Sequence, residues 1–101
     1  MFSEYQVREM VDTIVRTVQP LRVVVFGSYA RGNADNDSDI DFLVVERGPL
    51  RENGGRWEEI RKLRKALRPF RGAKDILVYS ADEAGRLRES PNHVVGEAFR
   101  N

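Results

Sequence analysis

The sequence contains no cysteine and a single histidine, His93, in 101 residues. The missing cysteine excludes disulfide bridges and thiolate metal sites, and it fits a reducing compartment. No apolar run approaches the roughly 20 residues that a membrane helix needs, and residues 1–6 lack the basic and apolar regions of a signal peptide. We therefore expect a cytoplasmic protein, in which the lone histidine offers no Ser-His-Asp arrangement.

Composition and length indicate one small folded domain. Hydrophobic residues make up 41% of the chain and charged residues 33%, which is too apolar for a disordered protein. A chain of 101 residues supports a single domain with a modest core. We therefore expect residues 1–101 to form one domain.

Charge is distributed unevenly along the chain, although the net charge is only +1. Residues 46–74 contain ten Lys or Arg and four Glu, whereas the remainder contains seven basic and twelve acidic residues. Two interpretations are open: a solvated helix of mixed charge, or a basic face that binds a polyanion or an acidic partner. Net charge alone does not distinguish them.

Apolar spacing predicts the first two elements of the chain. Ser3 and Gln6 form a capping-box pattern before apolar residues that recur every three or four positions. We therefore expect a helix over residues 4–18, which Pro20 stops. The β-branched run at residues 21–26 predicts a buried strand.

The rest of the chain alternates short helical and extended patterns. We expect one helical turn at 29–31, a strand at 40–45, an amphipathic helix over 55–68, a strand at 76–79, a helix start at Asp82 and Glu83, and a short last helix from Ser90 and Pro91. This order predicts an α/β (α+β) domain, with helices packed on a small mixed sheet. Trp57 lies on the apolar stripe of the second long helix and is either a core residue or an interface anchor.

Two aspartates stand at the start of the strand predicted at 40–45. Alternate residues of a strand point to the same face, so Asp39 and Asp41 point together while Ile40 points to the opposite layer. Neighbouring carboxylates repel each other, and a hard divalent cation removes that penalty. The pair is therefore a candidate Mg²⁺ site.

Asp75 adds a third carboxylate, because it precedes the strand at 76–79 in the same way. If the two strands are neighbours that start at the same level, the three carboxylates converge. Three carboxylates can hold two Mg²⁺ ions roughly 3.5–4 Å apart, an arrangement used for in-line nucleotidyl transfer. The alternative for Asp75 is an exposed residue at the start of the strand, paired with Lys74 or a nearby arginine.

Gly27 and Ser28 follow the strand at 21–26 and supply the features of a phosphate site. Glycine allows the backbone to approach a phosphate closely, and the turn leaves backbone N–H groups free to bind an anion. Ser28 can donate a hydrogen bond, and Arg31 can bind the same phosphates with its guanidinium group. The alternative for Arg31 is a surface salt bridge with a loop aspartate, Asp35 or Asp37.

The run Gly27-Ser28-Tyr29-Ala30-Arg31-Gly32, followed by Ser38-Asp39-Ile40-Asp41-Phe42, resembles the signature of the DNA polymerase β-like nucleotidyltransferase superfamily. It is most similar to the minimal, single-domain branch, the MNT proteins, which are commonly antitoxins encoded beside a HEPN-domain toxin. The resemblance covers residues 21–45 tightly and residues 75–79 loosely. It implies the polymerase β-like core: a small mixed sheet with helices packed on it.

By this resemblance, Gly27 and Ser28 contact the nucleotide phosphates, and Asp39, Asp41 and Asp75 are the catalytic metal ligands. The family implies Mg-ATP as the donor and transfer of AMP onto a protein hydroxyl, with a tyrosine of the cognate toxin as the best-known acceptor. The chain is too short to hold an acceptor by itself, so a partner protein is expected to present it.

Two other functions compete with this enzyme. The first is a non-catalytic antitoxin or binding module, which masks its partner through the basic helix 55–68 and the apolar C-terminal segment. The second is a nucleic-acid-binding domain that uses residues 46–74. The interspersed glutamates and the lack of aromatic pairs argue against nucleic acid.

Overall fold

The computed structural model describes residues 1–88, without the side chain of Asn53. The elements in this part of the chain are α1 (Glu4–Val18), β1 (Arg22–Phe26), α2 (Ser28–Arg31), β2 (Ile40–Glu46), the 3₁₀ helix η1 (Leu50–Asn53), α3 (Arg56–Ala66), β3 (Lys74–Ser80) and α4 (Ala81–Leu87). The predicted α/β fold class is confirmed, and the predicted elements that fall within residues 1–88 are all present. The helix predicted from Ser90 and Pro91 lies outside the described residues, as does His93.

The predicted capping box fixes the start of α1. The Ser3 hydroxyl accepts a hydrogen bond from the Gln6 N–H at 3.1 Å, and Gln6 Oε1 accepts one from the Ser3 N–H at 2.9 Å. The helix ends where Gln19 adopts a left-handed conformation, one residue before Pro20. Its apolar stripe buries Met10 and Ile14 completely, so packing of one face stabilises the helix.

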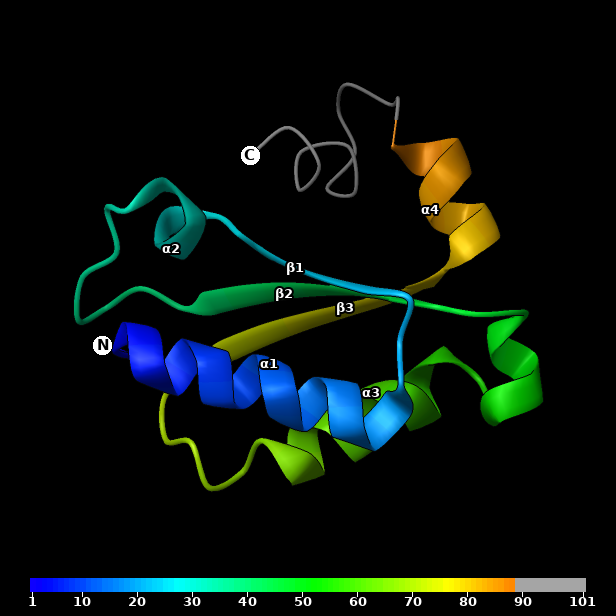
Figure 1. Cartoon of the computed structure of the whole chain (residues 1–101), viewed down its shortest axis with the longest axis horizontal. Coiled ribbons are helices and arrows are strands. Elements are labelled where there is room, and N and C mark those ends of the chain that lie inside the picture. The colour runs from blue at the N-terminus through cyan, green and yellow to red at the C-terminus, as the bar shows by residue number, and fades with distance from the viewer. Residues whose placement is uncertain (89–101) are drawn as a thin grey trace.

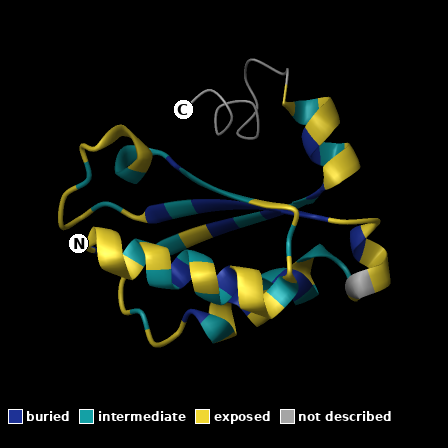
Figure 2. Ribbon diagram, viewed as in Figure 1, coloured by how far each residue is buried: buried dark blue, intermediate teal, exposed yellow. Residues whose placement is uncertain are grey.

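The three strands form one mixed sheet in the order β1-β2-β3. β1 pairs with β2 in the antiparallel sense, and β2 pairs with β3 in the parallel sense. The parallel pair needs a crossover connection, which contains η1 and α3. Because β2 lies in the centre, its residues are the most deeply buried of the sheet (Figure 2).

The two faces of the sheet are covered unequally (Figure 1). Helices α1 and α3 pack on one face, where Phe42, Val44 and Val78 join the main core. On the other face the short helix α4 packs Ala84 against Leu43. The second face therefore has less helical cover near the start of β2 and β3.

Trp57 is not part of the core. Its side chain is 76% exposed, whereas Leu63 and Leu67 are fully buried. The reason is helical geometry: Trp57 lies in line with Arg61 and Arg64 of α3, which are both exposed to solvent. The expectation of a core role for Trp57 is wrong, and the interface alternative remains.

The described helices include none with both the length and the apolar character that a bilayer crossing demands. α1 is the longest of them at 15 residues, and charged side chains interrupt it.

Candidate active site

A pocket of about 410 Å³ opens where β1 ends and where β2 and β3 begin. All six residues predicted to form the site line it, together with two further residues of the surrounding strand and loop. The lining residues are Phe26, Gly27, Ser28, Arg31, Asp37, Asp39, Asp41 and Asp75.

Strand register explains why these residues meet. The antiparallel register places Phe26 opposite Asp41, so the turn that follows β1 begins beside the start of β2. The parallel register places Asp41 opposite Asp75, so the two carboxylate-bearing positions lie side by side on adjacent strands. Ile40 points into the opposite layer, where it is fully buried. The aspartates therefore share the less covered face of the sheet.

Gly27 is the point of closest approach between the turn and the acidic strand. Its φ is +75°, and a Cβ atom added there would collide with the Asp41 carboxylate oxygen Oδ2. Any other residue would displace the carboxylate and strain the backbone. The turn then continues into α2, whose Arg31 N–H donates to the Gly27 carbonyl at 3.1 Å.

Tyr29 holds the turn in place from the other side. Its hydroxyl accepts a hydrogen bond from the Phe2 N–H at 2.8 Å, and the two rings lie 6.2 Å apart between centroids. Tyr29 also packs against the main core. Its role is therefore structural.

In the described part of the chain, Arg31 and Asp75 do not form the surface ion pairs that the sequence offers as alternatives to a role in the site. Within residues 1–88 the Arg31 side chain forms no ion pair with a loop aspartate. Lys74 donates to the Gly72 carbonyl at 2.9 Å instead of pairing with Asp75. Asp35 shapes the loop by accepting from the Asp37 N–H at 2.9 Å. Arg31 and Asp75 both line the pocket.

The acidic residues of the pocket provide oxygen donors of the kind that Mg²⁺ prefers. With the side chains as they stand, residues 1–88 contain no group of three acidic or histidine side chains that could hold a metal ion. Asp39 and Asp75 are exposed, and exposed side chains change rotamer on a nanosecond timescale. The donor set fits Mg²⁺ in type, and three-fold coordination requires the aspartate side chains to turn toward one another.

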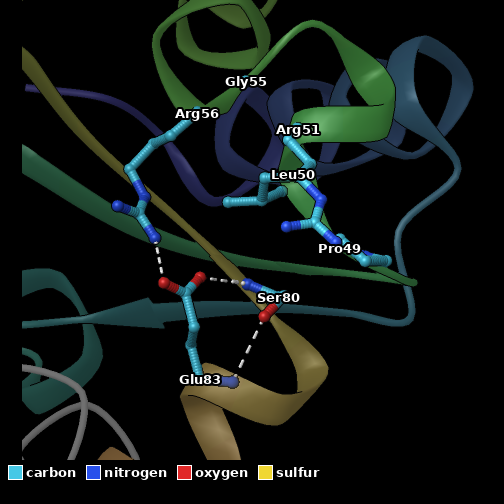
Figure 3. A pocket seen from close by; sticks show the side chains of 7 residues that line it. All are labelled: Pro49, Leu50, Arg51, Gly55, Arg56, Ser80 and Glu83. Carbon is cyan, nitrogen blue, oxygen red and sulfur yellow. Dashed lines mark hydrogen bonds and ion pairs between the residues drawn. The ribbon is translucent and has the colours of Figure 1, made fainter.

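A second pocket, of about 350 Å³, lies at the opposite end of the sheet, where Ser80 ends β3 (Figure 3). Arg56 donates to the Val78 carbonyl at 2.8 Å and forms an ion pair with Glu83. The hydrogen bond that Glu83 accepts from Arg56, followed by the one that it accepts from the Ser80 N–H, holds the pKa of Glu83 below its usual range. Arg56 thus ties α3 to β3 and α4, and we assign this pocket a structural role.

A buried acidic pair lies between β2 and α3, and sequence reasoning missed it. Glu46 and Glu59 are each only 3% exposed. Burial, followed by the hydrogen bond with Glu59, raises the pKa of Glu46 to about 8. The Lys62 ammonium lies 2.6 Å from the Glu59 carboxylate. In the sequence these residues belong to a stretch of mixed charge, which gives no signal of burial.

Comparison with solved structures places this architecture among nucleotidyltransferases. The chain superposes on a crystal structure of a provisionally assigned nucleotidyltransferase from Sulfolobus solfataricus with a TM-score of 0.58 and 28% identity, covering 79% of this chain and 68% of that one. It also matches a toxin–antitoxin structure crystallised with AMP-PNP, at a TM-score of 0.49 and 25% identity, with 79% and 65% of the two chains covered.

Sequence comparison gives a short match and a long one. A protein of Methanocaldococcus jannaschii that carries the provisional name of protein adenylyltransferase is 58% identical over 24 residues, which is 24% of this chain and 24% of that protein. The model of the nucleotidyltransferase domain family matches residues 6–96. The predicted enzyme class is thus confirmed at the level of the family: this chain belongs to the nucleotidyltransferase domain family.

Proposed function

We propose that this protein transfers AMP from ATP to the hydroxyl group of a tyrosine of a partner protein. The observation that carries the proposal is the pocket that gathers a glycine–serine turn, an arginine and three aspartates. The turn suits phosphate and the aspartates suit a divalent cation, which are the two parts of a Mg-nucleotide. The name of the short match from Methanocaldococcus jannaschii agrees with this reaction.

The phosphates are assigned to the side of the pocket formed by the turn. Gly27 brings the turn directly against the Asp41 carboxylate, so a phosphate bound at the turn would lie next to the aspartates. Ser28 donates its hydroxyl, and Arg31 supplies a positive charge that no group in residues 1–88 neutralises. Binding at this side orients the α-phosphorus toward the aspartates.

The aspartates are assigned to the metal and to the chemistry. Asp39, Asp41 and Asp75 would hold Mg²⁺, most simply as two ions, which neutralise the charge that builds on the phosphates during transfer. The acceptor oxygen attacks the α-phosphorus, the bond from that phosphorus to the bridging oxygen breaks, and pyrophosphate leaves. Among residues 1–88 the pocket is lined by carboxylates and by no histidine, so we assign the hydroxyl proton to one of these carboxylates.

The acceptor is assigned to a partner because the described residues form only the donor half of a site. The motif resemblance names a HEPN-domain toxin as that partner, and transfer to its tyrosine would make this protein the antitoxin. ATP is abundant in the cytoplasm, where we therefore place the reaction.

The test is incubation of the purified chain and its partner with α-labelled ATP and Mg²⁺. Label should appear on the partner and disappear with Asp39→Asn or Asp41→Asn. Asp12→Asn, which alters an exposed carboxylate of α1, is the matched control and should retain labelling. Labelling that persists in both pocket variants would refute the metal assignment.

A non-catalytic masking function is the second candidate. The exposure of Trp57 on a basic helix favours it, because an exposed tryptophan is typical of protein interfaces. Protection of cells by the Asp41→Asn protein distinguishes the two functions. Full protection would support masking, and lost protection with normal folding would support chemistry.

A further inference from the structure

A groove of about 750 Å³ runs along α3 beside β3. We call it the α3 groove, and the candidate active site does not include any of its lining residues. These are Trp57, Ile60, Arg61, Arg64, Lys65, Arg68 and Ile76. Trp57 is the most exposed large hydrophobic residue among residues 1–88, at 76%.

Most of the positive charge in the α3 groove is not neutralised. Arg61 pairs with Glu58 at 2.5 Å. The side chains of Arg64, Lys65 and Arg68 form no ion pair or hydrogen bond with residues 1–88. A set of unpaired cations around an aromatic side chain is complementary to an acidic ligand.

The α3 groove continues to the candidate active site. An intermediate pocket of about 410 Å³ shares Arg64 and Ile76 with the groove, and it shares Asp39 and Asp75 with the active-site pocket. The path runs around β3, which is an edge strand and leaves that side of the sheet open.

Lys74 extends the positive surface along this path. It lines the intermediate pocket, and its pKa is lowered by burial and then by the charge of Arg64. One surface therefore leads from an exposed tryptophan, past cations, to the aspartates.

We propose that the α3 groove docks an acidic segment of the acceptor protein, seated on Trp57, and so delivers the acceptor hydroxyl to Asp39 and Asp75. This inference rests on the proposed function for its endpoint, but the docking itself does not require the chemistry. A protein segment fits better than single-stranded nucleic acid. The groove has one aromatic residue, whereas proteins that bind single-stranded nucleic acid use several aromatic side chains on which the bases stack. Tryptophan and arginine are also the residues that contribute most to protein interfaces.

Trp57 is the only tryptophan of the chain, so its fluorescence reports directly on the α3 groove. The probe is a copolymer of glutamate and tyrosine, titrated without ATP while tryptophan alone is excited. The expected result is a saturable fluorescence change that weakens as salt is added. A copolymer of lysine and tyrosine should give no change.

Charge reversal tests the assignment to the groove. Arg64→Glu combined with Arg68→Glu should weaken binding of the acidic copolymer at least about tenfold at low salt. The matched control combines Arg16→Glu with Arg86→Glu, which makes the same change in net charge on exposed positions of α1 and α4. The control should bind within about twofold of the wild type. Circular dichroism of both variants verifies folding.

Three results would overturn the docking proposal. One is equal weakening in the groove variant and the control, and another is tighter binding of single-stranded oligouridylate than of the acidic copolymer. The third is a dimer that Trp57→Ala converts to a monomer, which would make the groove an interface between copies. A groove variant that binds Mg-ATP normally but no longer labels its partner separates failed docking from failed chemistry.

Discussion

Strand β2 carries an acidic residue near each end, and each of them faces a second carboxylate. At the start, Asp41 is in register with Asp75 and lines a pocket that is open to solvent. At the end, Glu46 is 3% exposed and lies against Glu59 of α3. The same like-charge pairing therefore occurs once where ligands have access and once where they have none.

The difference shows how access decides the role of a carboxylate pair. At the buried end a proton on Glu46 and the ammonium of Lys62 relieve the repulsion between the two carboxyl groups. At the open end the aspartates and Arg31 line one pocket among residues 1–88. We therefore assign structure to the first pair and chemistry to the second.

The sharpest test replaces the carboxylate near each end of β2 with an amide, in two separate variants. Asp41→Asn should lower labelling of the partner by about a thousandfold, since loss of a metal ligand removes roughly 4 kcal/mol of transition-state stabilisation. Glu46→Gln should leave labelling within about twofold of the wild type. Rates of label transfer at saturating Mg-ATP measure both. Equal losses in the two variants would contradict the division of roles.

The second test uses pH. The pKa of Glu46 is raised to about 8 in the folded chain, from its usual value of 4.5. Between these two pH values the folded state therefore binds one proton more than the unfolded state. The contribution of Glu46 to the free energy of unfolding is fully present below pH 4.5. It is lost as pH rises toward 8, by at most about 1.4 kcal/mol per pH unit. Denaturant unfolding at a series of pH values measures the slope.

Glu46→Gln should remove this slope and raise stability at pH 8. Glu52→Gln is the control, because it replaces an exposed carboxylate of η1 and should leave the slope unchanged. A slope that survives in the Glu46→Gln protein would assign the titration to another group.

The third test concerns the contact between the phosphate turn and Asp41. Gly27→Ala should destabilise the fold by roughly 2 kcal/mol, through a positive φ and a collision with the carboxylate. Gly32→Ala is a matched control, because its φ is +77° while its added Cβ meets nothing within 4 Å. Gly32→Ala should lower the free energy of unfolding only through the strain of the positive φ, by about 1 kcal/mol. Thermal unfolding of both proteins isolates the collision, and equal losses would disprove it.

Local patterns allowed most of the fold to be predicted. The capping box at Ser3 and the spacing of apolar residues gave α1, because both signals are contained within one helix. The positions of Asp39 and Asp41 beside a glycine–serine turn indicated one site, because strand alternation and short connections constrain them. Their roles in catalysis remain predictions.

Features that depend on packing between distant elements were not predictable in this way. Burial of Glu46 requires α3 to lie over the end of β2, and no local signal reports it. The exposure of Trp57 depends on which side of α3 meets the sheet. The bond from Arg56 to Glu83 joins residues 27 apart, which sequence spacing does not reveal.

The smallest expected effect is at the ion pair that closes the second pocket. Glu83→Gln keeps the hydrogen bond to the Ser80 N–H but removes the charge opposite Arg56. Because the pKa of Glu83 is lowered, its contribution is present above the usual glutamate pKa and is lost as pH falls through the lowered value. We expect a loss of about 0.5–1 kcal/mol at neutral pH, which shrinks toward zero in acid. Glu4→Gln, in the exposed pair with Arg8, should cost less, and an equal loss in the two variants would show that the Arg56–Glu83 pair adds no more stability than an exposed ion pair.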